Sequence, residues 1–306
     1  MNTLVVGSIN MDVINRVRRF PLPGETVKGT TTGYCAGGKG ANQAVAAARA
    51  GSKVTFIGAV GCDSYSDELI RLLGSSGIHH PLIIQKNGPS GIAHITIDEN
   101  GENYIVLSEG ANALLSPGEV NGLLKQQQNS FDAVLLQNEI PWETTRYVME
   151  EACKRGIRVF FNPAPAIDLP SEVFPLIDVM ILNDTELKII SGISATNDNE
   201  YNEALFKIIG LGVKNVVLTL GSKGVLFSNG WKTEHIPAYI VEAVDSTAAG
   251  DTFIGALVAA QNKGATDLAL ESLRFASAAA AIKVTRFRAQ EDIPVREEII
   301  RFLNNR

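Results

Sequence analysis

The residues best suited to chemistry lie between Val244 and Phe253, where small side chains lead into an expected helix. That helix is predicted because apolar residues recur at helical spacing, at Phe253, Ile254, Leu257 and Val258. N–H groups at a helix start lack intrahelical partners, and the helix dipole is positive there, so an anion site is expected. Side chains as small as Ala248, Ala249 and Gly250 leave the backbone open to a phosphoryl group. We interpret Asp251 as a base that takes a proton from a hydroxyl group; the alternative is an ordinary first-turn aspartate that favours the dipole.

Composition places the chain among ordinary globular proteins, with 306 residues, 45% of them hydrophobic and 20% charged. The net charge of −6, with no run of Lys or Arg, argues against a surface that binds nucleic acid. Three cysteines without Cys-x-x-Cys spacing indicate neither a disulfide framework nor a zinc site, and fit a reducing cytosol. Neither a signal peptide nor a membrane span is expected, because the chain enters a strand at once and lacks a long apolar run; a cytoplasmic location is predicted.

Short apolar runs alternate with helical stretches along most of the chain. Helices are predicted over 40–50, 66–76, 143–155 and 251–262. Strands are predicted over 4–7, 54–57, 82–84, 133–136, 159–161, 179–182 and 216–219. This alternation is typical of a doubly wound, mostly parallel α/β sheet with helices on both faces, and one domain spanning 1–306 is expected.

Two segments, 11–35 and 91–109, break this rhythm. The first alternates and then becomes rich in Thr and Gly, with little to bury, which is typical of a small exposed sheet. The second contains two strand-like runs joined by Glu99-Asn100-Gly101-Glu102, whose Asn-Gly pair predicts a hairpin turn. Together the segments are expected to form a small β-sheet inserted into the domain as a lid.

Polar residues follow the predicted strands at several junctions, and Asp251 begins its own helix. The clusters are Asn10 with Asp12, Gln137 to Glu139, Asn183 to Glu186, and Thr219 to Gly224. Because ligands of doubly wound sheets bind at the carboxyl ends of the strands, these clusters are expected to line one site. Asn10 and Asp12, two apart in an extended chain, point the same way and suit a sugar diol, although Asn-x-Asp is also ordinary loop sequence.

The run Gly37-Gly38-Lys39-Gly40-Ala41-Asn42 opens the first helix and, with Gly33, nearly forms a Walker A phosphate loop. Gly40 stands where that loop needs a Ser or Thr hydroxyl for magnesium, so a P-loop is excluded. The glycines still indicate close approach of a ligand to the backbone, with Lys39 and Asn42 as a polar wall. The alternative is a tight strand-to-helix turn.

Together these residues resemble the ribokinase-like (phosphofructokinase-B type) family of sugar and nucleoside kinases. The resemblance covers essentially the whole chain and lies in five motifs: Gly7 to Asp12, Gly37 to Ala44, Gly110 to Asn112, Asn162 to Pro165, and Asp245 to Phe253. It implies an ATP-dependent kinase that transfers the γ-phosphoryl group to the 5-hydroxyl of D-ribose. Alternatives are a relative that acts on deoxyribose, a nucleoside or a hexose, and a non-catalytic sugar-binding protein; the presence of Asp251 and Gly250 disfavours the last.

The resemblance also implies a role for each candidate residue. Asp251 would be the base, and the backbone of Ala248, Ala249, Gly250 and Asp251 the anion hole. The sugar would be held by Asn10, Asp12, Gly38, Lys39, Asn42 and Glu139. Asn183 and Glu186 would face the phosphate and Mg²⁺, and the nucleotide would contact Thr219, Gly221, Gly224 and Ser277.

The family often uses a monovalent cation, usually K⁺, beside the anion hole. Asp245 and Thr247 match that site, as do backbone positions near Lys283 and Arg288. The chain departs from the family pattern because Arg288 stands where Gly is usual and Asp292 where Ser is usual. The resemblance still implies activation by K⁺ over Na⁺. No activation would mean that the extra carboxylate or a basic side chain has replaced the ion, or that the site is absent. The resemblance further implies a homodimer formed through the lid sheet.

Overall fold

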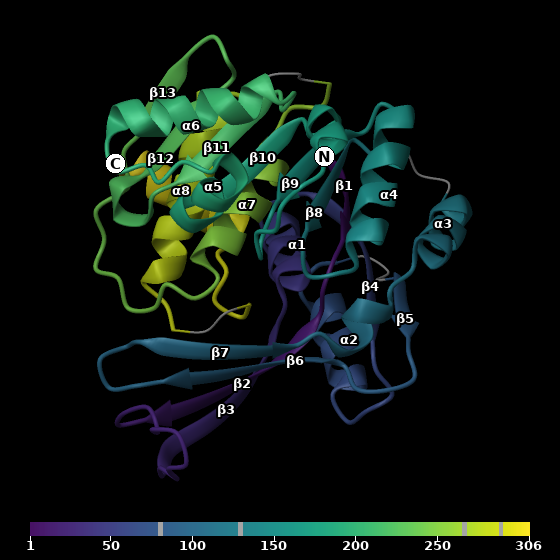
Figure 1. Cartoon of the computed structure of the whole chain (residues 1–306), viewed down its shortest axis with the longest axis vertical. Helices are drawn as coiled ribbons and strands as arrows, with labels where there is room; N and C mark the ends of the chain where they lie inside the picture. The colour runs from purple at the N-terminus through teal and green to yellow at the C-terminus, as the bar shows by residue number, and fades with distance from the viewer. Residues whose placement is uncertain (79–81, 128–130, 265–267, 288–289) are drawn as a thin grey trace.

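The computed structural model describes residues 1–78, 82–127, 131–264, 268–287 and 290–306. Within them, the larger of two sheets has nine strands in the order β13-β12-β11-β10-β9-β8-β1-β4-β5 (Figure 1). In chain order these are β1 (Asn2–Val6), β4 (Lys53–Val60), β5 (Leu82–Gln85), β8 (Ala133–Gln137), β9 (Arg158–Asn162), β10 (Val179–Asn183), β11 (Asn215–Thr219), β12 (Val225–Ser228) and β13 (Thr233–Ile236). The sheet is parallel from β5 to β11, and β12 and β13 are antiparallel additions at one edge.

Helices cover both faces of this sheet, so successive residues of a central strand enter different cores. In β1, Val5 packs into one apolar cluster, whereas Leu4 and Val6 pack into the other. The first cluster includes residues of α1 (Lys39–Arg49), α2 (Ser66–Ser75), α7 (Ala249–Ala259), α8 (Leu270–Val284) and α9 (Arg296–Asn304). The second includes residues of α3 (Pro117–Gln126), α4 (Trp142–Lys154), α5 (Asp184–Ser191) and α6 (Asp198–Gly210). Burial on both faces explains why the strands read as continuous apolar runs.

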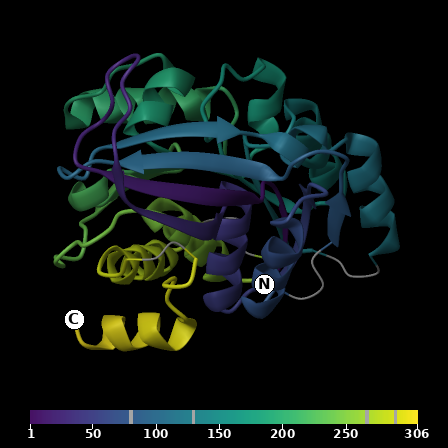
Figure 2. The ribbon, with the colours of Figure 1, turned by 90° about the horizontal axis from the view of Figure 1, so that it is seen from below.

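The smaller sheet has the order β3-β2-β6-β7, from β2 (Asn10–Val17), β3 (Gly29–Gly37), β6 (Gly91–Ile97) and β7 (Asn103–Ser108). The predicted Asn-Gly turn is confirmed, because β6 and β7 pair antiparallel and Gly101 has a φ of 84°. Figure 2 looks onto this sheet, with α8 and α9 in yellow on one side and the green and teal helices on the other. The predicted fold class, a mostly parallel α/β sheet with an additional small sheet, is confirmed.

No helix within the described residues is both long and apolar enough to cross a membrane.

Candidate active site

Asp251 lies in the first turn of α7, and its carboxylate is held by neutral amides. It accepts hydrogen bonds from Asn42 Nδ2 at 3.0 Å and from Gln43 Nε2 at 2.9 Å, both on α1. The two helices approach closely because Gly255 of α7 has no side chain; a Cβ there would come within 2.5 Å of the Ala46 Cβ. Among the described residues the carboxylate is thus oriented by amides and forms no ion pair that would neutralise it.

The backbone before Asp251 adopts an unusual conformation. Ala248 has φ 58° and ψ 14°, the left-handed region, and no other described non-glycine residue has a positive φ. Such a conformation costs about 1–3 kcal/mol and is concentrated at functional sites. Among the described residues, nothing accepts a hydrogen bond from the amides of Gly250 and Asp251. Of the predicted donors from Ala248 to Asp251, the amides of Gly250 and Asp251 are thus unpaired at the start of α7, where a negative group is favoured, whereas the Ala249 amide donates to Ser246 O at 3.1 Å.

A small cavity of about 160 Å³ borders these amides. It brings together the ends of β9, β10 and β11 with α1 and α7. Its polar lining is Lys39, Asn162, Asn183, Glu186, Thr219 and Asp251. Asn183 with Glu186, Thr219 and Asp251, which belong to three of the predicted clusters, thus border one cavity.

On the side of the smaller sheet, Asn10 and Asp12 are buried at the start of β2. Asn112 Nδ2 donates to Asn10 Oδ1 at 2.8 Å and thereby fixes that amide. Gly37 on β3 leaves room for the Asp12 carboxylate, which a Cβ there would overlap. Glu139 lies nearby and accepts from Ser8 Oγ at 2.6 Å and from the Lys39 amide at 3.0 Å.

The carboxylates of Asp12, Glu139 and Asp251 therefore lie around the ammonium group of Lys39, with Asp12 buried and the other two half-buried. Burial, with the nearby carboxylates of Glu139 and Asp251, raises the pKa of Asp12 to about 7, against the opposing charge of Lys39. Burial also raises the pKa of Glu139. Burial works against the charge of Lys39, but the surrounding carboxylates, Asp251 and Glu139 foremost, raise its pKa overall. An excess of acceptors over cations suits a neutral ligand rich in hydroxyl donors.

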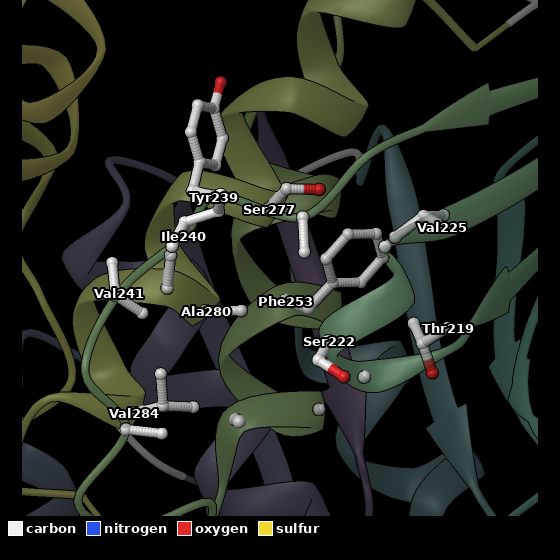
Figure 3. A pocket seen from close by; sticks show the side chains of 17 residues that line it. Thr219, Ser222, Val225, Tyr239, Ile240, Val241, Phe253, Ser277, Ala280 and Val284 are labelled. Carbon is white, nitrogen blue, oxygen red and sulfur yellow. The ribbon is translucent and has the colours of Figure 1, made fainter. Parts of the chain in front are cut away.

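A second cavity, of about 410 Å³, is lined by the side chains shown in Figure 3. Its walls are mostly apolar, formed by Phe253, Ala280 and Val284 among others. The predicted nucleotide residues Thr219, Gly221, Gly224 and Ser277 all line it. Ser277 Oγ is buried without a hydrogen-bond partner in the described chain, so it is available to a ligand. Thr219 and Gly250 line both cavities, so the two cavities adjoin each other.

Asn183 and Glu186 form a capping box at the start of α5. Glu186 accepts from the Asn183 amide at 2.9 Å and from Asn183 Nδ2 at 3.1 Å. Burial raises the pKa of the Glu186 carboxyl. The described residues contain no group of three or more His, Cys, Asp or Glu side chains that could hold a metal ion. A Mg²⁺ ion that arrives with phosphate and keeps most of its water fits the carboxylate and amide oxygens here.

The residues predicted for the monovalent cation are brought together only in part. Asp245 Oδ1 accepts from the Thr247 amide at 2.8 Å, and the Asp245 amide donates to Val284 O at 3.1 Å. This contact places the Asp245 loop beside the end of α8. Lys283, expected to contribute its backbone, also has a completely buried side chain in this region. Arg288 lies outside the described residues, whereas Asp292 lies within them.

Two buried amides of the site, those of Gln43 and Gln290, had no predicted role. Gln137 Nε2 donates to Gln43 Oε1 at 2.7 Å, and Gln43 Nε2 also donates to Asn162 Oδ1 at 3.1 Å. Gln290 Nε2 donates to Asn42 Oδ1 at 2.9 Å. The one available signal was a glutamine in an otherwise alanine-rich helix, which is Gln43. Gln290 carried no such signal.

The chain matches the model of the pfkB family carbohydrate kinases over residues 2–296. It is 40% identical over 305 residues to a ribokinase of Haemophilus influenzae, with 98% of each chain covered. It is 36% identical over 257 residues to a deoxyribokinase of Salmonella typhi, with 83% of this chain and 84% of that protein covered. The structure resembles that of Arabidopsis thaliana ribokinase complexed with ribose and ATP, with a TM-score of 0.88, 31% identity, and 99% and 98% of the two chains covered.

Proposed function

The chain belongs to the pfkB family of carbohydrate kinases and is an ATP-dependent sugar kinase; from this premise we propose that it phosphorylates the 5-hydroxyl of D-ribose. The observation that carries the proposal is the position of Asp251. Its carboxylate lines a small polar cavity beside two unpaired backbone amides, and the neighbouring Gly250 also lines a largely apolar cavity. The 40% identity to a ribokinase of Haemophilus influenzae supports ribose as the acceptor of this chain.

In the proposed reaction Asp251 accepts the proton of the sugar hydroxyl as its oxygen attacks the γ-phosphorus of ATP. The bond from that phosphorus to the β-phosphate oxygen breaks, and ADP leaves. The amides of Gly250 and Asp251 would stabilise the negative charge on the phosphoryl oxygens. A positioned base contributes roughly 10²–10⁴-fold, and orientation of the two substrates supplies much of the remainder.

Each pocket has a proposed ligand. Asn10, Asp12, Gly38, Lys39, Asn42 and Glu139 would bind the sugar, and Thr219, Gly221, Gly224 and Ser277 the nucleotide. Asn183 and Glu186 would face Mg²⁺, which neutralises phosphate charge when bound. Lys283 buries a positive charge in the region expected for potassium, so the proposal includes Mg²⁺ without K⁺.

The experiment is a rate measurement with purified protein, ATP and Mg²⁺ against ribose, 2-deoxyribose, fructose and adenosine. Ribose is expected to give the highest kcat/KM, with deoxyribose at least about tenfold lower. The 36% identity to a deoxyribokinase keeps deoxyribose as the second candidate. Equal or better use of deoxyribose would refute ribose as the acceptor while leaving the kinase family intact.

We further propose that two copies associate through the smaller sheet. The edge strand β7 pairs on one side only, with β6, and its residues Tyr104, Ile105 and Val106 are 67%, 57% and 65% exposed, an unusual apolar surface for an edge strand. Light scattering after gel filtration is expected to give the mass of a dimer, and Val106→Lys that of a monomer. A wild-type protein that runs as a monomer at micromolar concentration contradicts this pairing.

A further inference from the structure

Lys283 lies in the last turn of α8 and is completely buried, with 0% of its surface exposed. A lysine near a helix C-terminus normally keeps its ammonium group in water, where it still favours the dipole. Here the Nζ atom instead makes a long hydrogen bond of 3.5 Å to Arg286 O. Within the described residues no carboxylate forms a salt bridge with it. Burying a charged group with so little direct compensation costs free energy, and this cost indicates that the ammonium group of Lys283 has a role.

The surroundings of Lys283 indicate that role. Burial lowers its pKa and Arg286 adds to that effect, whereas the charges of Asp245 and Asp292 oppose it. Asp245 belongs to the loop that runs into the anion-binding start of α7. The amides of Val244 and Asp245 donate to Val284 O, at 2.7 and 3.1 Å, so this loop is anchored directly beside Lys283.

The same part of the chain is connected to Asp251. Gln290 donates to Asn42, and Asn42 donates to Asp251, at 2.9 and 3.0 Å. Residues near the end of α8 therefore contact both the loop that leads to the amides and the partner that orients the base. A cation here would hold the loop oxygens in place without touching the sugar or ATP.

The resemblance implies K⁺ at this place, but the residues present do not fit it. A second positive charge beside a buried ammonium group is repelled, and more strongly there than in water. We propose that the ammonium group of Lys283 is a built-in replacement for the monovalent cation, and that Lys283 is a positioning residue which makes turnover independent of K⁺. The inference rests on the proposed phosphoryl transfer.

The first test uses the wild-type protein in chloride salts of K⁺, Na⁺ and tetramethylammonium at equal ionic strength. Both kcat and the melting temperature are expected to be the same in K⁺ and in tetramethylammonium, since an ion without a site cannot stabilise the fold by binding. Activation of wild-type turnover by K⁺ together with a K⁺-specific rise in melting temperature would overturn the proposal.

The second test uses Lys283→Ala, which removes the charge and opens space. In tetramethylammonium the kcat of Lys283→Ala is expected to be lower than that of the wild type by about tenfold or more, because misplaced reacting groups lower the rate. K⁺ is expected to restore part of this kcat. The melting temperature of Lys283→Ala should become K⁺-dependent. Lys207→Ala, an exposed lysine in the last turn of α6, is the matched control and should behave like wild type.

The two proposals fail separately. If no pentose is phosphorylated, the melting temperatures still decide whether Lys283 excludes K⁺. If Lys283→Ala keeps wild-type turnover without K⁺ and shows no K⁺-dependent melting, the cation role is wrong although ribose phosphorylation stands. The wild-type salt series requires no variant to fold.

Discussion

Asp251→Asn is expected to lower kcat by roughly 10²-fold or more while the protein stays folded and still binds ribose. The substitution keeps the size and planarity of the side chain but removes its capacity to take a proton. One of its two oxygens becomes an NH₂ group that faces a donor from Asn42 or Gln43. Losing that hydrogen bond is expected to reduce stability by about 1 kcal/mol, much less than the effect on turnover.

Steady-state rates, ribose affinity by calorimetry and urea unfolding together check this result. The matched control is Asp198→Asn, because Asp198 is an exposed aspartate in the first turn of α6. If Asp251 only favours the helix dipole, both substitutions should reduce stability slightly and leave kcat unchanged. Near-wild-type turnover in Asp251→Asn would therefore remove the base from the mechanism.

The sheet was predictable because burial on both faces leaves a local mark in the sequence. β1, β8 and β10 are short apolar runs, and each is followed by polar residues at the same edge. The position of Asp251 in the first turn of α7 was also predictable, since a glycine, a carboxylate and a helical apolar pattern occur within a few residues. The exposed smaller sheet followed from alternation and from the Asn-Gly turn.

The contacts that orient Asp251 were not predictable, because they join residues far apart in the chain. Gln43 meets Gln137 and Asn42 meets Gln290 through side chains of residues 94 and 248 positions apart. No local pattern specifies which buried amide meets which partner. Lys283 shows the same limit, because a lysine near a helix end predicts a solvated side chain, whereas the structure buries it.

We propose that the choice between ribose and deoxyribose depends on Asp12. Its carboxylate is buried, and within the described chain no donor is hydrogen-bonded to it, so the hydroxyls of a ligand would be its partners. A sugar that lacks one of these hydroxyls leaves the acceptor unpaired, at a cost of about 1–3 kcal/mol. That cost corresponds to roughly 10–150-fold in kcat/KM.

Asp12→Ala should therefore reduce kcat/KM for ribose by about tenfold or more and reduce kcat/KM for deoxyribose much less, so that the preference for ribose over deoxyribose narrows.

The pKa of Asp12, about 7, makes the preference for ribose over deoxyribose depend on pH. Ionisation above that value gives a stronger acceptor, so the ribose-to-deoxyribose ratio should rise as the pH passes upward through about 7. The charges of Glu139, Asp251 and Lys39 also act on Asp12, but these residues remain in the variant. Asp12→Asn, which keeps the shape without the charge, should show a flat ratio. A ratio that rises equally in wild type and in Asp12→Asn would assign the discrimination to another group.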